Sequence, residues 1–181
     1  MNTLLNFAQD GSVAAAARIT YGTTQSTLGR MLVARSERGI CAIFLNDNDA
    51  ALVNELAGSF PMSEIALDAD AMASTLSAVA KYIAAPSGDF DLPLDVQGTP
   101  FQRAVWSKLA EVPAGQTLTY SELAERVGNP AAVRAVASAC AANRLAVAIP
   151  CHRALRRDGT LTGYRWGLSR KRALLDAERC V

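Results

Sequence analysis

The sequence has little of the chemistry that builds metal sites or disulfide frameworks. It contains one histidine and four cysteines, and no two cysteines are spaced as a CxxC pair: Cys41, Cys140, Cys151 and Cys180. A structural zinc site needs about four grouped Cys or His ligands. Scattered cysteines in an intracellular chain favour free thiols. We therefore expect no metal, no cofactor and no disulfide framework.

Long hydrophobic runs and a secretion signal are also missing. No apolar run approaches the roughly 20 residues that span a bilayer. Residues 1–17 lack the basic start and continuous apolar core of a signal peptide, and we expect them to form a frayed leader. Half of the chain is nevertheless hydrophobic, which is enough for a core in one domain or two small ones. These features predict a cytoplasmic protein without membrane contact.

Charge is unevenly distributed along the chain. Residues 1–98 carry 5 basic and 11 acidic side chains, a net charge of −6, whereas residues 99–181 carry 13 basic and 6 acidic ones, a net charge of +7. A basic region of this kind is typical of a domain that binds a polyanion such as nucleic acid. An ordinary solvated basic face explains the charge alone equally well.

The first half predicts a small α/β domain over residues 18–86. Three segments rich in β-branched and aliphatic residues are predicted strands: residues 19–24, 29–36 and 40–46. Glu37-Arg38-Gly39 is typical of a hairpin turn. Cys41 falls within an apolar strand, and we expect it to be a core residue.

Two helices are expected after these strands. Asp47 or Asp49 is a candidate N-cap for the first. The second is predicted from about residue 68 to 84, with one apolar face: Met72, Leu76, Val79 and Ile83. Residues 87–98 then have the composition of a linker. The second predicted domain covers residues 99–181.

The second domain begins with clear helix start signals. Thr99 and Gln102 form a capping box around Pro100, ahead of an apolar stripe: Phe101, Val105, Trp106 and Leu109. Thr119 and Glu122 form a second capping box. The helix that follows it ends at Gly128. Asn129-Pro130 then starts a third predicted helix, which runs to about Ala142 with Asn143 as its C-terminal cap.

Two helices joined by Gly128-Asn129 have the pattern of a helix-turn-helix. On the second, Arg134, Ser138 and Ala141 are expected to face outward. A major-groove reader needs several long polar side chains, whereas small residues around one arginine suit close approach to a sugar-phosphate surface or a minor groove. A packed helix pair with no binding role remains an alternative.

Cys151 is the candidate nucleophile, within Ile149-Pro150-Cys151-His152-Arg153. A thiol attacks as its thiolate, and a free cysteine with a pKa of about 8.5 is mostly protonated at neutral pH. His152 could accept the proton, and Glu178, beside an apolar face of a last helix starting near residue 168, could orient it. Residues 153–164 predict a short hairpin or a basic loop. From the residues alone, a buried structural thiol is an equally good interpretation.

Four segments carry a resemblance to the O6-alkylguanine-DNA alkyltransferases (methylated-DNA–protein-cysteine methyltransferases), including the Ada-type repair domains: residues 36–43, 133–143, 149–153 and 159–167. The resemblance implies an α+β two-domain fold. A ribonuclease H-like α/β domain would precede a mostly α-helical, winged helix-turn-helix-like catalytic domain.

The resemblance also implies a function, the direct reversal of damage in double-stranded DNA. The alkyl group of O6-alkylguanine would move irreversibly to Cys151 after the base is flipped, once per molecule and without a cofactor. O4-alkylthymine stays open as a second substrate. A monomer is expected.

Catalytic roles follow from the same resemblance. Cys151 matches the acceptor, His152 the water-linked base and Glu178 the carboxylate that orients it. Asn143 matches the residue that braces the active-site turn. Tyr120 matches the tyrosine that assists nucleotide rotation and protonates the departing guanine.

Binding roles are implied as well. Arg134 matches an arginine finger that fills the gap in the base stack, and Ser138 and Ala135 on the same helix are predicted DNA contacts. The predicted pocket is lined by Tyr164, Ser169 and Ala154. The family usually has Val where this chain has Ala154, so we expect a modestly different pocket shape.

Three other functions compete with this one. A non-catalytic binder of alkylated DNA on the same scaffold would replace the acceptor cysteine, which is present in this chain. A helix-turn-helix transcription regulator conflicts with the small residues of the second helix. A thiol hydrolase using Cys151 and His152 lacks a separate oxyanion-hole or substrate motif.

Overall fold

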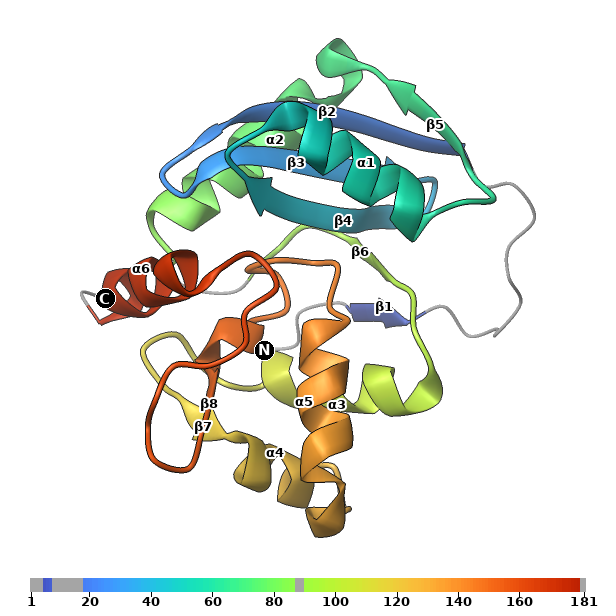
Figure 1. Ribbon diagram of the computed structural model, residues 1–181. Helices are drawn as coiled ribbons and strands as arrows, with labels where there is room; N and C mark the ends of the chain where they lie inside the picture. Colours follow the sequence, from blue (N-terminus) through green and yellow to red (C-terminus); the bar gives the residue numbers. More distant parts are fainter. Residues whose placement is uncertain (1–4, 8–17, 87–89, 180–181) are drawn as a thin grey trace. The chain divides into compact units, whose positions relative to one another are not determined.

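The computed structural model describes residues 5–7, 18–86 and 90–179, and the chain divides into two compact units (Figure 1). The first comprises residues 1–84 and 90–97, and the second comprises residues 85–89 and 98–181. The first unit is a sheet with helices and the second is mostly helical. The α+β two-domain organisation predicted from the sequence is confirmed.

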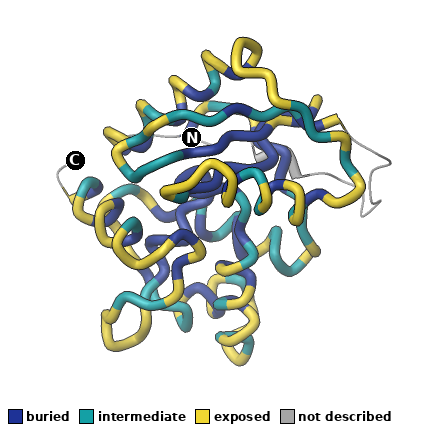
Figure 2. The backbone as a smooth tube through the Cα atoms, turned by 45° about the horizontal axis from the view of Figure 1, so that its top comes forward, coloured by how far each residue is buried: buried dark blue, intermediate teal, exposed yellow. Residues whose placement is uncertain are grey.

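A six-stranded sheet in the order β1-β6-β4-β3-β2-β5 forms the first unit. Its strands are β1 (Leu5–Phe7), β2 (Arg18–Ser26), β3 (Gly29–Ser36), β4 (Gly39–Asn46), β5 (Glu64–Leu67) and β6 (Leu94–Val96). The antiparallel β2-β3-β4 meander confirms the three predicted strands, and the other strands add in parallel. Seven residues of β4 are buried, so both faces of the sheet are covered there (Figure 2). Cys41 is a core residue, as predicted.

Two helices, α1 (Asp49–Ser59) and α2 (Ala69–Ala84), pack on this sheet. The four predicted apolar residues of α2 are all buried. The N-cap prediction for α1 was wrong: the Asn48 side chain caps the helix by accepting a hydrogen bond from the backbone N–H of Ala51 at 3.2 Å. Asp49 instead pairs with Arg30 at 2.6 Å, a contact between strand and helix that local sequence does not reveal.

Two predicted boundaries differ from the structure. Residues 87–98 were predicted to be a linker, yet β6 lies within them and pairs with β4 and β1. Leu5–Phe7, predicted to belong to a frayed leader, form β1; residues 1–4 and 8–17 of that leader lie outside the described residues. A short apolar segment can complete a sheet whatever the composition of its flanks, and Leu94 and Val96 are buried there.

The second unit contains four α-helices among its described residues: α3 (Pro100–Ala110), α4 (Tyr120–Arg126), α5 (Val133–Ala141) and α6 (Leu168–Glu178). Both predicted capping boxes are confirmed, at Thr99 before α3 and Thr119 before α4. The indole N–H of Trp106 donates to the Ala139 carbonyl at 2.9 Å and ties α3 to α5. Among the described residues, no helix has the length and hydropathy needed to span a membrane.

The third predicted helix is shorter than expected. Residues 130–132 form a 3-10 turn (η1, Pro130–Ala132), and α5 ends with Ala142 as its cap. Asn143 is therefore not the cap, because its side chain turns inward. Arg134, Ser138 and Ala141 are exposed, as predicted.

A small two-stranded sheet joins distant parts of the second unit. β7 (Leu118–Thr119) pairs in parallel with β8 (Ala154–Leu155). Residues 153–164 were predicted to form either a short hairpin or a basic loop. The structure shows the loop, because β8 pairs with β7 and not with a later strand of the same segment. This pairing places the segment after Cys151 beside the start of α4.

Candidate active site

Asn143 organises the turn that leads to the candidate nucleophile. Its side-chain amide donates to the carbonyl of Ile149 at 2.9 Å and to that of Leu145 at 3.3 Å, and its Oδ1 accepts from the backbone N–H of Leu145 at 2.8 Å. The same amide lies 3.3 Å from the sulfur of Cys151. One buried side chain therefore shapes the turn and points an N–H group at the thiol.

The turn itself is strained. Val147 has a φ of 61°, a left-handed conformation that is unfavourable for a β-branched residue. The backbone around it is held by short hydrogen bonds, including Ala148 to Ala146 at 2.6 Å and Ile149 to Leu145 at 3.0 Å. Such strain persists only where the surroundings enforce it, and it is concentrated at functional sites.

Cys151 starts a short 3-10 turn (η2, Cys151–Arg153) and is only 4% exposed. Burial raises the pKa of its thiol to about 11, although Asn143, Lys171 and Arg165 act in the opposite direction. The resting group is therefore a thiol, and its ionisation at pH 7 costs about 5 kcal/mol. A nucleophile in this state needs a base and a local source of positive charge.

His152 is the base that the geometry offers. Burial lowers the pKa of its imidazole, so the ring is neutral at pH 7. Its Nε2–H then donates to Glu178 Oε1 at 2.7 Å, which leaves Nδ1 as a lone-pair acceptor. Nδ1 is buried and has no hydrogen-bond partner within the described part of the chain.

Arg153 neutralises the carboxylate that holds this histidine. Its guanidinium contacts both oxygens of Glu178, at 2.7 to 3.1 Å, and also donates to the Val112 carbonyl. Burial alone would raise the pKa of Glu178, but the hydrogen bonds from His152 and Arg153 outweigh it and hold this pKa at about 2. The sequence pattern did not predict that Arg153 pairs with Glu178, although Arg153 lies within the 149–153 segment.

Lys171 is a second site residue that the sequence pattern did not predict. It is fully buried, and its Nζ donates to the carbonyls of Ala154 at 2.6 Å and Thr162 at 3.1 Å. Its spacing in the sequence could have indicated burial, because Lys171 shares one face of α6 with Leu174, Leu175 and Glu178. A lysine in register with an apolar face is a candidate buried cation.

Two tyrosines lie near this network. The Tyr120 hydroxyl donates to the Thr162 carbonyl at 3.5 Å, and burial raises the pKa of Tyr120 to about 12. The ring of Tyr164 packs perpendicular to that of His152, with 6.3 Å between centroids. Burial also raises the pKa of Tyr164 well above its ordinary value, so both phenols keep their protons at neutral pH.

A cavity of about 600 Å³ lies between helices α4 and α5 and the loop that follows β8. It brings together Tyr120, Arg134 and residues of that loop: Arg156, Arg157, Asp158, Thr162 and Gly163. Of the other predicted DNA contacts, Ser138 and Ala135 are exposed on α5 but do not line this cavity.

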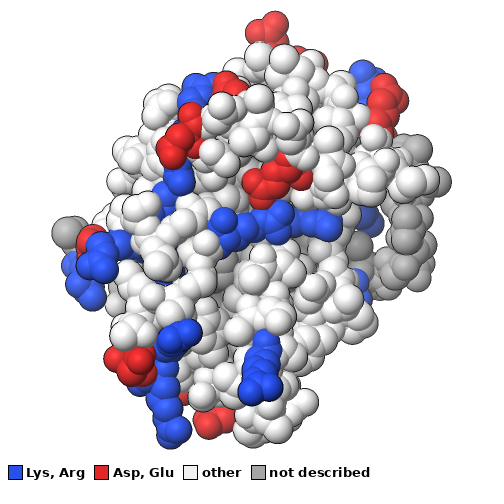
Figure 3. Space-filling model, in the orientation of Figure 1, with Lys and Arg blue, Asp and Glu red and all other residues white. Residues whose placement is uncertain are grey.

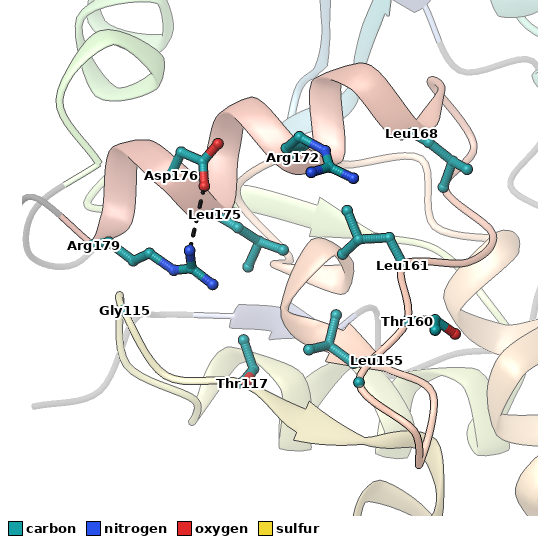
Figure 4. A pocket seen from close by; sticks show the side chains of 11 residues that line it. Gly115, Thr117, Leu155, Thr160, Leu161, Leu168, Arg172, Leu175, Asp176 and Arg179 are labelled. Carbon is teal, nitrogen blue, oxygen red and sulfur yellow. Dashed lines mark ion pairs between the residues drawn. The ribbon is translucent and has the colours of Figure 1, made fainter.

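The three predicted pocket residues lie elsewhere. Ala154 and Tyr164 are buried, and Ser169 is exposed in the first turn of α6. They line neither the cavity at Tyr120 nor a second one of about 550 Å³ beside α6, where Leu155, Leu161 and Leu175 face Arg172 (Figure 4). Within the described residues, no three His, Cys, Asp or Glu side chains are grouped as metal ligands.

Both units match known protein families. Residues 19–96 match the 6-O-methylguanine DNA methyltransferase, ribonuclease-like domain, and residues 100–180 match the 6-O-methylguanine DNA methyltransferase, DNA binding domain. Together these two ranges cover most of the chain. They correspond to the sheet unit and the helical unit of the structure.

Individual relatives agree with these matches. The chain is 52% identical over 161 residues to the bifunctional transcriptional activator/DNA repair enzyme Ada of Escherichia coli, covering 88% of this chain and 45% of Ada. It is 42% identical over 120 residues to the inducible methylated-DNA–protein-cysteine methyltransferase of Bacillus subtilis, covering 66% of this chain and 67% of that protein. The chain thus spans about half the length of Ada.

A solved structure supports the same relationship. The crystal structure of Mycobacterium tuberculosis O6-methylguanine methyltransferase matches with a TM-score of 0.75 and 32% identity, covering 90% of this chain and 93% of that one. The same M. tuberculosis protein has been crystallised in complex with DNA, and that structure matches with a TM-score of 0.73. By sequence in both units and by fold, the chain belongs to the O6-methylguanine DNA methyltransferase family.

Proposed function

We propose that this protein repairs double-stranded DNA by moving the alkyl group of O6-alkylguanine to Cys151. The observation that carries the proposal is the buried thiol beside a neutral histidine whose free nitrogen is an acceptor and whose other nitrogen is held by an ionised carboxylate. Family membership supports it, since the B. subtilis relative is named a methylated-DNA–protein-cysteine methyltransferase.

The bonds and protons of the transfer balance within these residues. The Cys151 sulfur forms a bond to the alkyl carbon while the bond from that carbon to guanine O6 breaks. The thiol proton passes through a water molecule to His152 Nδ1, and the Tyr120 hydroxyl supplies a proton to the departing guanine. Once the DNA leaves, His152 releases its proton to solvent and the Tyr120 phenolate takes one up, so no proton is gained or lost overall. The product is a thioether, which no group of the site hydrolyses, so each molecule acts once.

The protonation states support these roles. The Glu178 carboxylate, neutralised by Arg153, stabilises the imidazolium that forms when His152 takes the proton. Burial keeps the proton on Tyr120 until a strong acceptor arrives. Asn143 holds the sulfur in place throughout.

The DNA-binding part of the proposal is a winged helix-turn-helix. Helix α5 presents Ser138 and Ala135, whose small exposed side chains permit close approach to the duplex, and Arg134 would fill the gap that a flipped base leaves. The β7–β8 pair and the loop after it would form the wing. Lys and Arg side chains over the second unit supply positive charge for phosphates (Figure 3).

The deciding experiment is the intact mass of the protein after incubation with duplex DNA that contains O6-methylguanine. We expect a gain of one methyl group, mapped to Cys151 and abolished in Cys151→Ala. Cys140→Ala is the matched control, because Cys140 is a second buried thiol of the same unit and should be dispensable. Methyl transfer that survives Cys151→Ala would contradict the proposal.

A further inference from the structure

Lys171 is a buried cation that forms no ion pair with a carboxylate in the described part of the chain. It is 0% exposed, and its Nζ donates to two backbone carbonyls. Burying an unpaired charge costs several kcal/mol, and a hydrophobic residue at this position would avoid that cost. The two carbonyls that accept from its Nζ offset only part of it.

The acidic groups that act electrostatically on Lys171 are the thiols of Cys151 and Cys140. Both Cys151 and Cys140 favour its protonated form, while burial lowers its pKa. The influence is mutual, because Lys171 and Arg165 favour the thiolate of Cys151. Geometry links Lys171 to the same turn, because its Nζ donates to the carbonyl of Ala154, and the backbone N–H of Ala154 caps η2 by donating to the Cys151 carbonyl.

The hydrogen bonds of Lys171 reach both ends of one loop. Ala154 precedes and Thr162 follows the segment 155–161, whose Leu155 and Leu161 lie close to α6 in Figure 4. The Thr162 carbonyl also accepts from the Tyr120 hydroxyl. Helix α4, the loop and α6 therefore meet at a single carbonyl oxygen, which Lys171 holds in place.

We propose that Lys171 is a positioning residue for alkyl transfer: it fixes the loop 155–161 and, through the Thr162 carbonyl, the Tyr120 hydroxyl, while its positive charge stabilises the Cys151 thiolate. The inference rests on the proposed function. As the thiol proton leaves toward His152, negative charge develops on the buried sulfur. A fixed positive charge is most effective in such surroundings.

The test of the charge needs no DNA. Reaction of Cys151 with iodoacetamide is followed from pH 6 to pH 8, well below the pKa of about 11 of this thiol, by peptide mass mapping in the wild type, Lys171→Met and Lys171→Gln. The rate in this range is proportional to the thiolate fraction, and we expect it to be about tenfold lower in both variants, since both lack the charge. Lys108→Met is the matched control, because Lys108 is a partly exposed lysine that pairs with Glu111, and its profile should coincide with that of the wild type.

Positioning is separated from charge by the rate of methyl transfer from duplex DNA. Lys171→Gln keeps an N–H donor for the Ala154 and Thr162 carbonyls, so it should transfer faster than Lys171→Met although both have the same iodoacetamide profile. Tryptophan fluorescence identifies the folded variants. If Lys171→Met does not fold, Lys171→Gln is compared with the wild type, and its iodoacetamide rate decides the charge. Because Gln keeps the donor, its methyl transfer should slow by no more than its iodoacetamide reaction does, and a larger loss would contradict positioning through that donor.

The outcomes that overturn the inference are distinct from a failure of the proposed function. Coincident iodoacetamide profiles for the wild type and Lys171→Gln would refute the stabilising charge. Equal transfer rates in a folded Lys171→Met and the wild type would refute positioning. A wild type that takes no methyl group from DNA would refute the proposed function, whereas the iodoacetamide profile would still test the charge.

Discussion

Among the described residues, each unit buries one carboxylate, and the two are used differently. In the first unit, Asp95 accepts from Ser36 at 2.7 Å and from Gln97 at 2.9 Å, and it pairs at 3.0 Å with Arg38, whose side chain is half exposed. That ion pair lacks hydrogen-bond geometry, so Asp95 Oδ1 has no hydrogen-bond partner within the described residues. In the second unit, Glu178 joins a buried arginine to a histidine that follows a thiol.

The comparison shows that burial of a carboxylate does not by itself mark a reactive site. Asp95 ties the β3–β4 turn to β6 and contacts no base or nucleophile in the described structure. Glu178 acts on His152, whose other nitrogen is free to accept a proton. Asp95 joins structural elements, whereas Glu178 orients a base. Mutation of the two carboxylates should therefore have different effects on methyl transfer.

The largest effect is expected for Glu178→Gln. The change leaves Arg153 without its counter-charge and removes the carboxylate that orients His152. We expect a loss of about 3–5 kcal/mol in the free energy of unfolding. Methyl transfer by the folded fraction should fall about 100-fold or more, because general-base assistance is lost. Urea unfolding and single-turnover transfer measure the two, and an unchanged transfer rate would remove Glu178 from the mechanism.

Asp95→Asn is the matched change in the first unit. It removes the charge but keeps an acceptor for Ser36, so we expect a loss of about 1–2 kcal/mol in stability. The transfer rate per folded molecule should equal that of the wild type. A rate that falls as far as in Glu178→Gln would mean that the two carboxylates are not functionally distinct.

Acid should unfold the second unit through its buried groups. The pKa of Glu178 in the folded state, about 2, lies below its ordinary 4.5, so its stabilisation is complete above pH 4.5 and is lost as pH falls toward 2. The lowered pKa of His152 has the same sign, with stability lost as pH falls below 6.5.

Tryptophan fluorescence can follow this transition, because Trp106 and Trp166 are the only tryptophans and both belong to the second unit. In Glu178→Gln, the loss of stability between pH 4.5 and 2 should be smaller than in the wild type. An identical pH dependence in both proteins would show that Glu178 does not contribute to the acid transition.

The smallest effects are expected at helix caps. Asn48→Ala in the first unit and Thr119→Ala in the second each remove a side-chain hydrogen bond at a helix start, at a cost of about 1 kcal/mol. Thr119→Ala should also slow methyl transfer by a few-fold, because Tyr120 is the first residue of α4. Chemical unfolding and transfer assays separate the two, and equal transfer rates would show that the cap does not position Tyr120.

Local features were predictable because their causes lie within a few residues. The two capping boxes, the β2–β4 strands and the outward face of α5 follow from patterns at spacings of two to four residues, and the structure contains all three. Asn48 illustrates the limit. The sequence offered Asp47 and Asp49 as caps for α1, yet Asn48 caps the helix, and Asp49 pairs with Arg30, 19 residues away in sequence.

The sequence by itself determined the β2–β4 strands, the helices that follow the two capping boxes, the candidate thiol and, through resemblance, Glu178 as the partner of His152 and Asn143 as the brace of the turn. Only the tertiary structure decided that β1 and β6 complete the sheet, that Ala142 and not Asn143 caps α5, and that Arg153 and Lys171 are buried cations. The physical reason is that a charge or an amide is useful in a core only when distant backbone and side-chain groups accept its hydrogen bonds. Folding brings those groups together, and no local pattern records them.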